Sequence, residues 1–408
     1  MGSGKPKIVM LGYAVENTEV GLLDSLAARP GMDFTFISSC WYGSHMPQGY
    51  AEQNNFRIEY DRPFNLFYAD DPKAGDKAIA EADLLIVAAT DQEKFRKYVG
   101  KKPICFFKER YFKKPKSWRN IIHDFFSFNI QFRWHNPKKM YLFTAGAFTY
   151  GDYFRYHCFR HRAYSFPYAV LGQQKNIESL LPKFSQGPVT IAFVGNLQPA
   201  KRVDILLRYA VHLKEQKVDF RIFIVGKNFM GNSLTNYVKS NGLEKNVLFA
   251  GSIVGDILDR SAIYVSTGGR LEGFNTGLYS AMQSACACVS CFFSGSSLEL
   301  IKNGKTGLIY TTEADFFSKM DKLVSDRNLQ KNMGVAAFEY YQSTWRTSFF
   351  GERFEAMLPQ LLTGGKGSPY SDGPMAPALL IKYWGSKPAS KRYDPISVID
   401  RVEDYRDL

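Results

Sequence analysis

Short apolar runs alternate with amphipathic helical segments along most of the chain, and this alternation constrains the fold more than any other feature. The runs are residues 7–11, 34–37, 83–87 and 103–107 in the first half, and 189–194, 220–225, 247–251 and 261–266 in the second. Runs of this length suit strands buried on both faces, joined by helices. We therefore predict an α/β fold with mostly parallel sheets, whose ligands bind beyond the carboxyl ends of the strands. Gly12, directly after the first run, is a candidate for such a position.

The composition allows two ordinary domains and favours an anionic partner. The chain has 408 residues, 45% of them hydrophobic, which is enough for two cores. Its formal net charge of +13 points to nucleotide phosphates, a membrane surface or nucleic acid. No apolar run reaches the ~18 residues of a membrane span. Six cysteines in apolar surroundings predict reduced, buried thiols and a cytoplasmic protein.

One stretch, residues 271–310, carries a specific indication of chemistry. Glu272 stands in a glycine-containing turn before a short helix, whose first N–H groups would belong to Phe274, Asn275 and Thr276. Such N–H groups and the helix dipole favour a phosphate. Because a carboxylate repels phosphate, Glu272 is better placed to accept hydrogen bonds from hydroxyls attached beyond it, as on a sugar. The alternative is that Glu272 only complements the helix dipole.

A second candidate phosphate site follows the apolar run at residues 189–194. Gly195, Asn196, Lys201 and Arg202 lie there in a glycine turn ahead of a helix. Backbone amides and cations in such a turn could together hold a phosphate. The alternative is a helix-start lysine that faces only solvent.

Both stretches resemble the donor-binding segments of family 4 glycosyltransferases, retaining enzymes of the GT-B fold. The matching residues are Gly195, Leu197, Pro199 and Lys201, then Glu272-Gly273-Phe274, Ala281-Met282, Leu298-Glu299-Leu300-Ile301 and Asn303-Gly304-Lys305-Thr306-Gly307. Three residues depart from the family pattern. Ser280 replaces a second glutamate that in the family holds the nucleotide ribose, Asn196 replaces an arginine, and Arg202 replaces a glycine.

The resemblance implies two Rossmann-like domains whose parallel sheets face each other across a cleft. Residues 1–175 would bind the acceptor, residues 188–345 a nucleotide-diphosphate sugar, and a helix in residues 346–363 would cross back to the first domain. The implied reaction is retaining, metal-independent sugar transfer to a glycan or lipid-linked acceptor in cell-surface polysaccharide synthesis, with no cofactor. Residues 364–408 are rich in Gly, Pro and Ser over much of their length and are expected to form an extended or flexible tail.

The resemblance also assigns roles to residues. Lys201, and Arg202 in place of the missing cation, would neutralise the departing diphosphate, while Glu272 would orient the sugar. The implied donor-binding set is Gly195, Asn196, Gly251, Ser252, Ile253, Gly273, Phe274, Asn275, Thr276 and Ser280. Two other functions stay open: a non-catalytic GT-B protein that binds a partner, suggested by Ser280 and Asn196, and a nucleic-acid-binding protein, suggested only by the charge.

The N-terminal half offers weaker candidates. Residues 101–119 combine eight basic residues with one acid, Glu109, and five interleaved aromatics. This run could lie on the anionic inner face of a membrane, bind nucleic acid, or form a solvated face. Its centre resembles an element of bacterial surface-polysaccharide members of the same family, in which Glu109 and Arg110 would face the cleft; the alternative is an internal salt bridge. His123, beside Asp124, is a further candidate for acid–base chemistry on the acceptor side.

Overall fold

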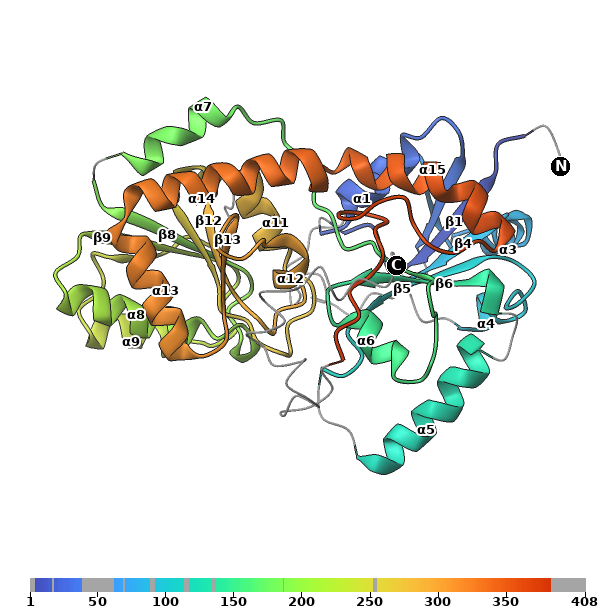
Figure 1. Cartoon of the computed structure of the whole chain (residues 1–408), viewed down its shortest axis with the longest axis horizontal. Helices are drawn as coiled ribbons and strands as arrows, with labels where there is room; N and C mark the ends of the chain where they lie inside the picture. The colour runs from blue at the N-terminus through green and yellow to red at the C-terminus, as the bar shows by residue number, and fades with distance from the viewer. Residues whose placement is uncertain are drawn as a thin grey trace. The chain divides into compact units, whose positions relative to one another are not determined.

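The computed structural model describes residues 4–16, 18–38, 62–68, 70–88, 92–113, 117–133, 137–185, 187–251 and 255–382. They form two compact units, one of residues 4–172 with 344–382, the other of residues 173–343 (Figure 1). Each unit is a parallel sheet joined by helices, so the α/β prediction is confirmed.

The N-terminal unit has a sheet with the order β3-β2-β1-β4-β5-β6-β7, in which every pair is parallel. The strands are β1 (Lys7–Gly12), β2 (Asp33–Ser38), β3 (Asn65–Phe67), β4 (Leu84–Val87), β5 (Ile104–Glu109), β6 (Met140–Ala145) and β7 (Ala163–Ser165). β4 and β6 are buried over their whole length, which explains their unbroken apolar sequences.

Helices complete the N-terminal unit. They are α1 (Val20–Ala27), α3 (Pro72–Glu81), α4 (Gln92–Arg96), α5 (Trp118–Phe128), α6 (Thr149–Phe154) and α15 (Ser348–Thr363), with the π-helical turn η1 (Asn129–Arg133) and the 3-10 turn η2 (Pro137–Lys139). α15 packs along α1, where the Ser25 hydroxyl accepts a hydrogen bond from the Gly351 amide (2.7 Å). A side chain on Gly351 would collide with the Ser25 carbonyl, so the glycine permits this close approach.

The C-terminal unit has the parallel order β10-β9-β8-β11-β12-β13. Its strands are β8 (Val189–Val194), β9 (Phe220–Val225), β10 (Val247–Phe249), β11 (Ile263–Ser266), β12 (Ala287–Cys291) and β13 (Gly307–Tyr310). Its helices are α7 (Ile177–Leu180), α8 (Val203–Glu215), α9 (Ser233–Ser240), α10 (Gly255–Arg260), α11 (Thr276–Gln283), α12 (Ser297–Leu300), α13 (Glu313–Ser325) and α14 (Arg327–Tyr340), with the turns η3 (Leu181–Phe184), η4 (Pro199–Lys201) and η5 (Tyr341–Trp345).

In both sheets the order in which the chain adds strands reverses at the same place. The chain adds strands outward from β1 and then returns to place β4 on its other side, and it does the same with β8 and β11. Crossovers leave the two central strands in opposite directions, which opens a crevice at their carboxyl ends. The loops that follow β1, β4, β8 and β11 are therefore the candidates for a functional site.

The start of the predicted tail is not a flexible appendage. Residues 375–378 run antiparallel to β7: the Met375 amide donates to the Ser165 carbonyl (2.7 Å), and the Ala378 amide to the Ala163 carbonyl (3.0 Å). Met375 and Ala378 are fully buried, and Ile381 is 1% exposed. The segment covers an otherwise open sheet edge, a role that its Gly- and Pro-rich composition hides. Residues 383–408 lie outside the described part.

Candidate active site

The carboxyl ends of β8 and β11 bring the two predicted donor-site loops together. β8 and β11 are paired in parallel, with Ile263 opposite Ile191. The loop after β8 leads to Lys201, and the loop after β11 leads to Glu272. Two segments about seventy positions apart in the sequence thus meet at the switch point of this sheet.

Lys201 and Glu272 form an ion pair there. The Lys201 Nζ lies 2.5 Å from the Glu272 Oε1; the Glu272 side chain is 2% exposed and the Lys201 side chain 21%. The Ser266 hydroxyl reaches the other carboxylate oxygen at 3.5 Å. The Thr267 hydroxyl donates to the Lys201 carbonyl (2.7 Å) and ties the two loops together. The site therefore combines a buried carboxylate with a cation that solvent, or a ligand, can reach.

Glycines make room for this arrangement. A Cβ on Gly268 would lie 1.9 Å from the Glu272 Oε2, so the carboxylate occupies the space that a side chain would fill. A Cβ on Gly226 would lie 2.0 Å from the Gly195 carbonyl, and both glycines have positive φ. Gly195 also lies against the Lys201 side chain, whose nearest carbon would be 3.7 Å from an added Cβ. Close backbone packing below Lys201 thus depends on glycine.

The start of α11 differs in detail from the predicted row of three amides. Asn275 is the N-cap: its side chain accepts from the Gly277 amide (2.9 Å) and donates to the Ser266 hydroxyl (2.8 Å). Phe274 is buried, and the Gly273 carbonyl accepts from the Gly295 amide. Thr276 is the first residue of the helix, and no contact of its amide is seen among the described residues. Asn275 therefore links β11 to α11 through its side chain.

The remaining predicted donor residues have varied positions. The Ser280 hydroxyl donates to the Thr276 carbonyl one turn earlier (3.2 Å), and Asn196 is half-buried beside Gly195. Gly251, with φ +61°, accepts a hydrogen bond from the Gly226 amide (2.6 Å). Ser252 and Ile253 lie outside the described residues.

Arg202 does not take the place predicted for a second diphosphate cation. Its guanidinium forks onto the Asp204 carboxylate with contacts of 3.1 and 3.2 Å, and its side chain is 48% exposed. Burial alone would raise the pKa of Asp204, but hydrogen bonds from Arg202 and Arg208 outweigh it and lower the pKa. Arg202 also has a left-handed backbone, with φ +49°. The glycine of the family pattern suits that conformation, so the position serves backbone geometry.

One acceptor-side candidate, Arg110, is buried inside the N-terminal unit. The Arg110 side chain is 3% exposed; its Nε lies 3.8 Å from Asp152 Oδ2, and its guanidinium stacks over Phe148. Asp152 also accepts from the amides of Tyr111 and Phe112. Arg110 is thus part of an internal ion pair, which is the alternative that the sequence left open for it.

The other acceptor-side candidates are Glu109, Gly12 and His123. Glu109 is 30% exposed and pairs with Lys113 at 2.5 Å. Gly12 ends β1, where a side chain would collide with the Phe36 ring. His123 is 81% exposed, 3.9 Å from Asp124, whose carboxylate points inward and accepts from the Tyr111 hydroxyl (2.9 Å). His123 therefore lies within ion-pair distance of Asp124, whose carboxylate also binds the Tyr111 hydroxyl.

Sequence reasoning missed two carboxylates that follow β1. Burial raises the pKa of Glu16 to about 7, and burial and the charge of Glu16 raise the pKa of Glu19 well above its usual range. Burial raises the pKa of Tyr168 too, with Glu109, Glu19 and Glu16 adding to the effect. The available signal was position: Glu16 and Glu19 are spaced by three residues at the start of α1, at the switch point of the first sheet.

The described ranges contain no group of three His, Cys, Asp or Glu side chains placed to hold a metal ion. The five cysteines found there are free and buried, as predicted. None of the helices described is long and apolar enough to cross a membrane.

Comparisons with known proteins agree with this geometry. Residues 176–340 match the family model described as glycosyl transferases group 1. That segment holds Lys201, Glu272 and all of α11. No curated protein matches the chain.

Solved structures of glycosyltransferases resemble the chain over most of its length. HepE of Anabaena, solved with UDP, aligns with a TM-score of 0.63 and 13% identity over 87% of this chain and 100% of HepE. A glycosyltransferase of Rickettsia africae ESF-5 aligns with a TM-score of 0.63 and 14% identity, over 88% and 99%. A mutant of S. aureus TarM, solved with fondaparinux, alpha-GlcNAc-glycerol and UDP, aligns with a TM-score of 0.52 and 13% identity, and this chain spans 55% of its length. The chain has the GT-B fold.

Proposed function

We propose that the protein is a retaining glycosyltransferase that moves a sugar from a nucleotide-diphosphate sugar to a glycan or lipid-linked acceptor. The observation that carries the proposal is the contact between Lys201 and Glu272 at the switch point of the second sheet. It lies inside the region that matches glycosyl transferases group 1. In a sugar diphosphate, the cation suits the diphosphate and the carboxylate suits the hydroxyls of the sugar.

The physical task of the site is to manage charge. When the bond between sugar and diphosphate breaks, negative charge gathers on the diphosphate and positive charge develops on the sugar ring. The Lys201 ammonium has three N–H donors, so it can turn toward the diphosphate, and the N-terminal end of α11 adds partial positive charge. On this proposal no metal and no cofactor is needed.

Burial of Glu272 gives the proposal a further support. A carboxylate that is 2% exposed is costly to leave without donors. If Lys201 turns to the diphosphate, hydroxyl groups of the donor sugar can replace its hydrogen bond to Glu272. Replacing the hydrogen bond from Lys201 by hydrogen bonds from the sugar would orient the sugar, and in the same step it would align the diphosphate with Lys201.

Several solved neighbours suggest which donor to test first. HepE was solved with UDP-glucose, and the pneumococcal O-GlcNAc transferase GtfA with UDP and GlcNAc. We propose a UDP-sugar as the first donor to test, an acceptor bound by the N-terminal unit, and a role in cell-surface polysaccharide synthesis at the cytoplasmic face of a membrane.

A donor screen tests the proposal. Binding and slow hydrolysis of UDP-, GDP- and ADP-sugars are measured with the wild type, Lys201→Ala and Glu272→Gln, in the presence of EDTA. We expect one donor class to bind, and turnover to fall about 10²–10³-fold in each variant, because an electrostatic contact to the transition state is lost. Lys239→Ala, an exposed lysine of α9, is the matched control and should keep wild-type turnover. Wild-type turnover in Lys201→Ala would contradict the assignment, and NMR of the product's anomeric carbon tests retention.

A non-catalytic GT-B protein remains the second candidate, favoured by Ser280. Its hydroxyl is used within α11, and it is too short to replace the longer carboxylate that the family pattern has at this position. Donor binding by the wild type with neither hydrolysis of the donor nor transfer to any acceptor in a screen would favour this second function.

A further inference from the structure

Helix α5 has two apolar faces, and only one of them is covered. Its inner face packs on the core of the N-terminal unit through Phe128, continued by Phe132 in η1, which are 8% and 3% exposed. The outer face presents Trp118, Ile122, Phe125, Phe126 and Ile130, with exposed fractions of 67%, 49%, 37%, 53% and 47%. Helices that are apolar on both sides are usually buried on both sides or bound to a partner.

This outer face stands out from the rest of the described surface. Ten large apolar residues are exposed in the described ranges, and five of them lie on these thirteen positions. The other five are scattered over both units. A gathered apolar patch of this kind marks a binding surface. Figure 1 shows α5 at the periphery of its unit, where such a surface is accessible.

The charges around α5 select the chemistry of the partner. The only carboxylate of the helix, Asp124, is buried and held by the hydroxyls of Tyr111 and Tyr156. The outer face therefore carries no acid. Arg119 lies over the Trp118 ring, and the sequence just before the helix adds Lys113, Lys114 and Lys116. Apolar side chains flanked by cations suit a surface with acyl chains below anionic headgroups.

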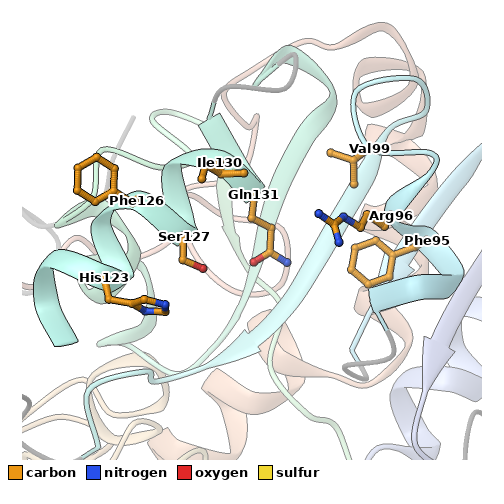
Figure 2. A pocket seen from close by; sticks show the side chains of 8 residues that line it. All are labelled: Phe95, Arg96, Val99, His123, Phe126, Ser127, Ile130 and Gln131. Carbon is orange, nitrogen blue, oxygen red and sulfur yellow. The ribbon is translucent and has the colours of Figure 1, made fainter.

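A cavity of about 640 Å³ continues the outer face inward. Phe126 and Ile130 of the outer face form one side, and Phe95 and Val99 the other (Figure 2). Arg96, His123, Ser127 and Gln131 also line it, so the cavity is half apolar and half polar.

We propose that the outer face of α5 docks on an anionic lipid bilayer, with Trp118, Ile122 and Phe126 at the boundary between headgroups and acyl chains. This narrows the membrane surface expected from residues 101–119 to the end of that run and α5, because Phe106, Phe107 and Phe112 are core residues, at most 3% exposed. A second copy of the chain is the alternative occupant that the test below distinguishes.

Vesicle sedimentation of the full chain tests the inference. The probes are vesicles of phosphatidylglycerol with phosphatidylcholine, and of phosphatidylcholine alone. We expect binding to the anionic vesicles only, and a loss of at least about tenfold in partition coefficient for Ile122→Ser/Phe126→Ser, which removes two large apolar groups from the bilayer boundary. The matched control is Phe229→Ser/Leu248→Ser, which changes two equally exposed residues of the other unit and should bind as the wild type does. Brominated lipid should quench wild-type tryptophan emission more than that of Trp118→Phe.

The possible outcomes separate the partners. Equal partition of the α5 variant and the wild type would overturn the proposal, and so would a dimer in solution that Ile122→Ser/Phe126→Ser abolishes. Donor binding by the same variants shows that they are folded. It also separates this inference from the transferase proposal: loss of vesicle binding with donor binding intact concerns only α5, and absence of donor binding in all proteins concerns only the proposed function.

Discussion

The two units have the same strand order, yet the carboxyl ends of their central strands carry opposite chemistry. In the C-terminal unit a partly exposed cation, Lys201, meets a buried carboxylate. In the N-terminal unit the cation Arg110 is buried in an internal ion pair, and the residues near the switch point, Glu16 and Glu19, are acids whose pKa is raised. A shared sheet order therefore fixes where loops meet, whereas the side chains of those loops decide what can bind there.

Removing one member of each ion pair is the most direct test of this contrast between the two units. Arg110→Ala should lower the free energy of unfolding by about 3–5 kcal/mol, because it leaves the buried carboxylate of Asp152 without its cation. Glu272→Gln should leave stability unchanged or raise it, because it removes a buried charge while Lys201 stays in reach of water. Urea unfolding followed by circular dichroism measures both.

Two further variants control this measurement. Arg119→Ala removes an exposed arginine of the same unit and should change stability by at most a few tenths of a kcal/mol. Arg110→Leu combined with Asp152→Asn should recover part of the loss, since no buried charge then stays unpaired. If Arg110→Ala were as stable as the wild type and failed only in transfer to acceptor, Arg110 would be a ligand-binding residue after all.

The acids of the N-terminal unit predict a pH dependence of stability. Burial raises the pKa of Glu16 from its ordinary 4.5 to about 7. Between these values the unfolded chain binds fewer protons than the folded one, so this group's contribution to stability falls as pH rises from 4.5 to 7 and stays low above that. Glu16→Gln should therefore be more stable than the wild type at pH 8, by about 1–3 kcal/mol, and equally stable at pH 4.

Thermal unfolding across this pH range measures the difference. Beside burial, the charge of Glu16 raises the pKa of Glu19, so the same series in Glu19→Gln shows how much of the effect comes from this neighbouring acid. A constant difference between Glu16→Gln and the wild type at every pH would mean that folding does not shift the pKa of Glu16.

The cap of α11 offers a smaller test on the C-terminal side. Asn275 accepts from the Gly277 amide and donates to Ser266. Asn275→Ala should cost about 1–2 kcal/mol, since it loses the cap and leaves a buried hydroxyl without its donor. Asn275→Asp keeps the cap and should separate the two contributions, because it cannot donate to Ser266. Unfolding midpoints in urea report both, and no loss in Asn275→Ala would mean that the cap is dispensable.

The sequence was informative where local spacing determines the backbone. The apolar runs predicted the strands, and the turns after β8 and β11 predicted the places of Lys201 and Glu272. These two residues meet because β8 and β11 are adjacent strands. Contacts between distant positions were not accessible in this way: nothing in the run around Arg110 indicates Asp152 as its partner. The second apolar face of α5 is readable from the helical spacing of Trp118, Ile122 and Phe126.

Arg202 allows the smallest and cleanest test, because it compares side-chain and backbone explanations at one position. Its guanidinium pairs with Asp204 on the surface, while its φ of +49° suits glycine. Arg202→Ala and Arg202→Gly both lose the ion pair, so their difference isolates the backbone. Arg202→Gly should be more stable than Arg202→Ala by about 1 kcal/mol, the usual cost of a left-handed conformation for a residue with a Cβ. If the two variants were equally stable, and both lost donor turnover, Arg202 would act through its charge, and the contrast between one functional cation in the second sheet and none in the first would have to be redrawn around two.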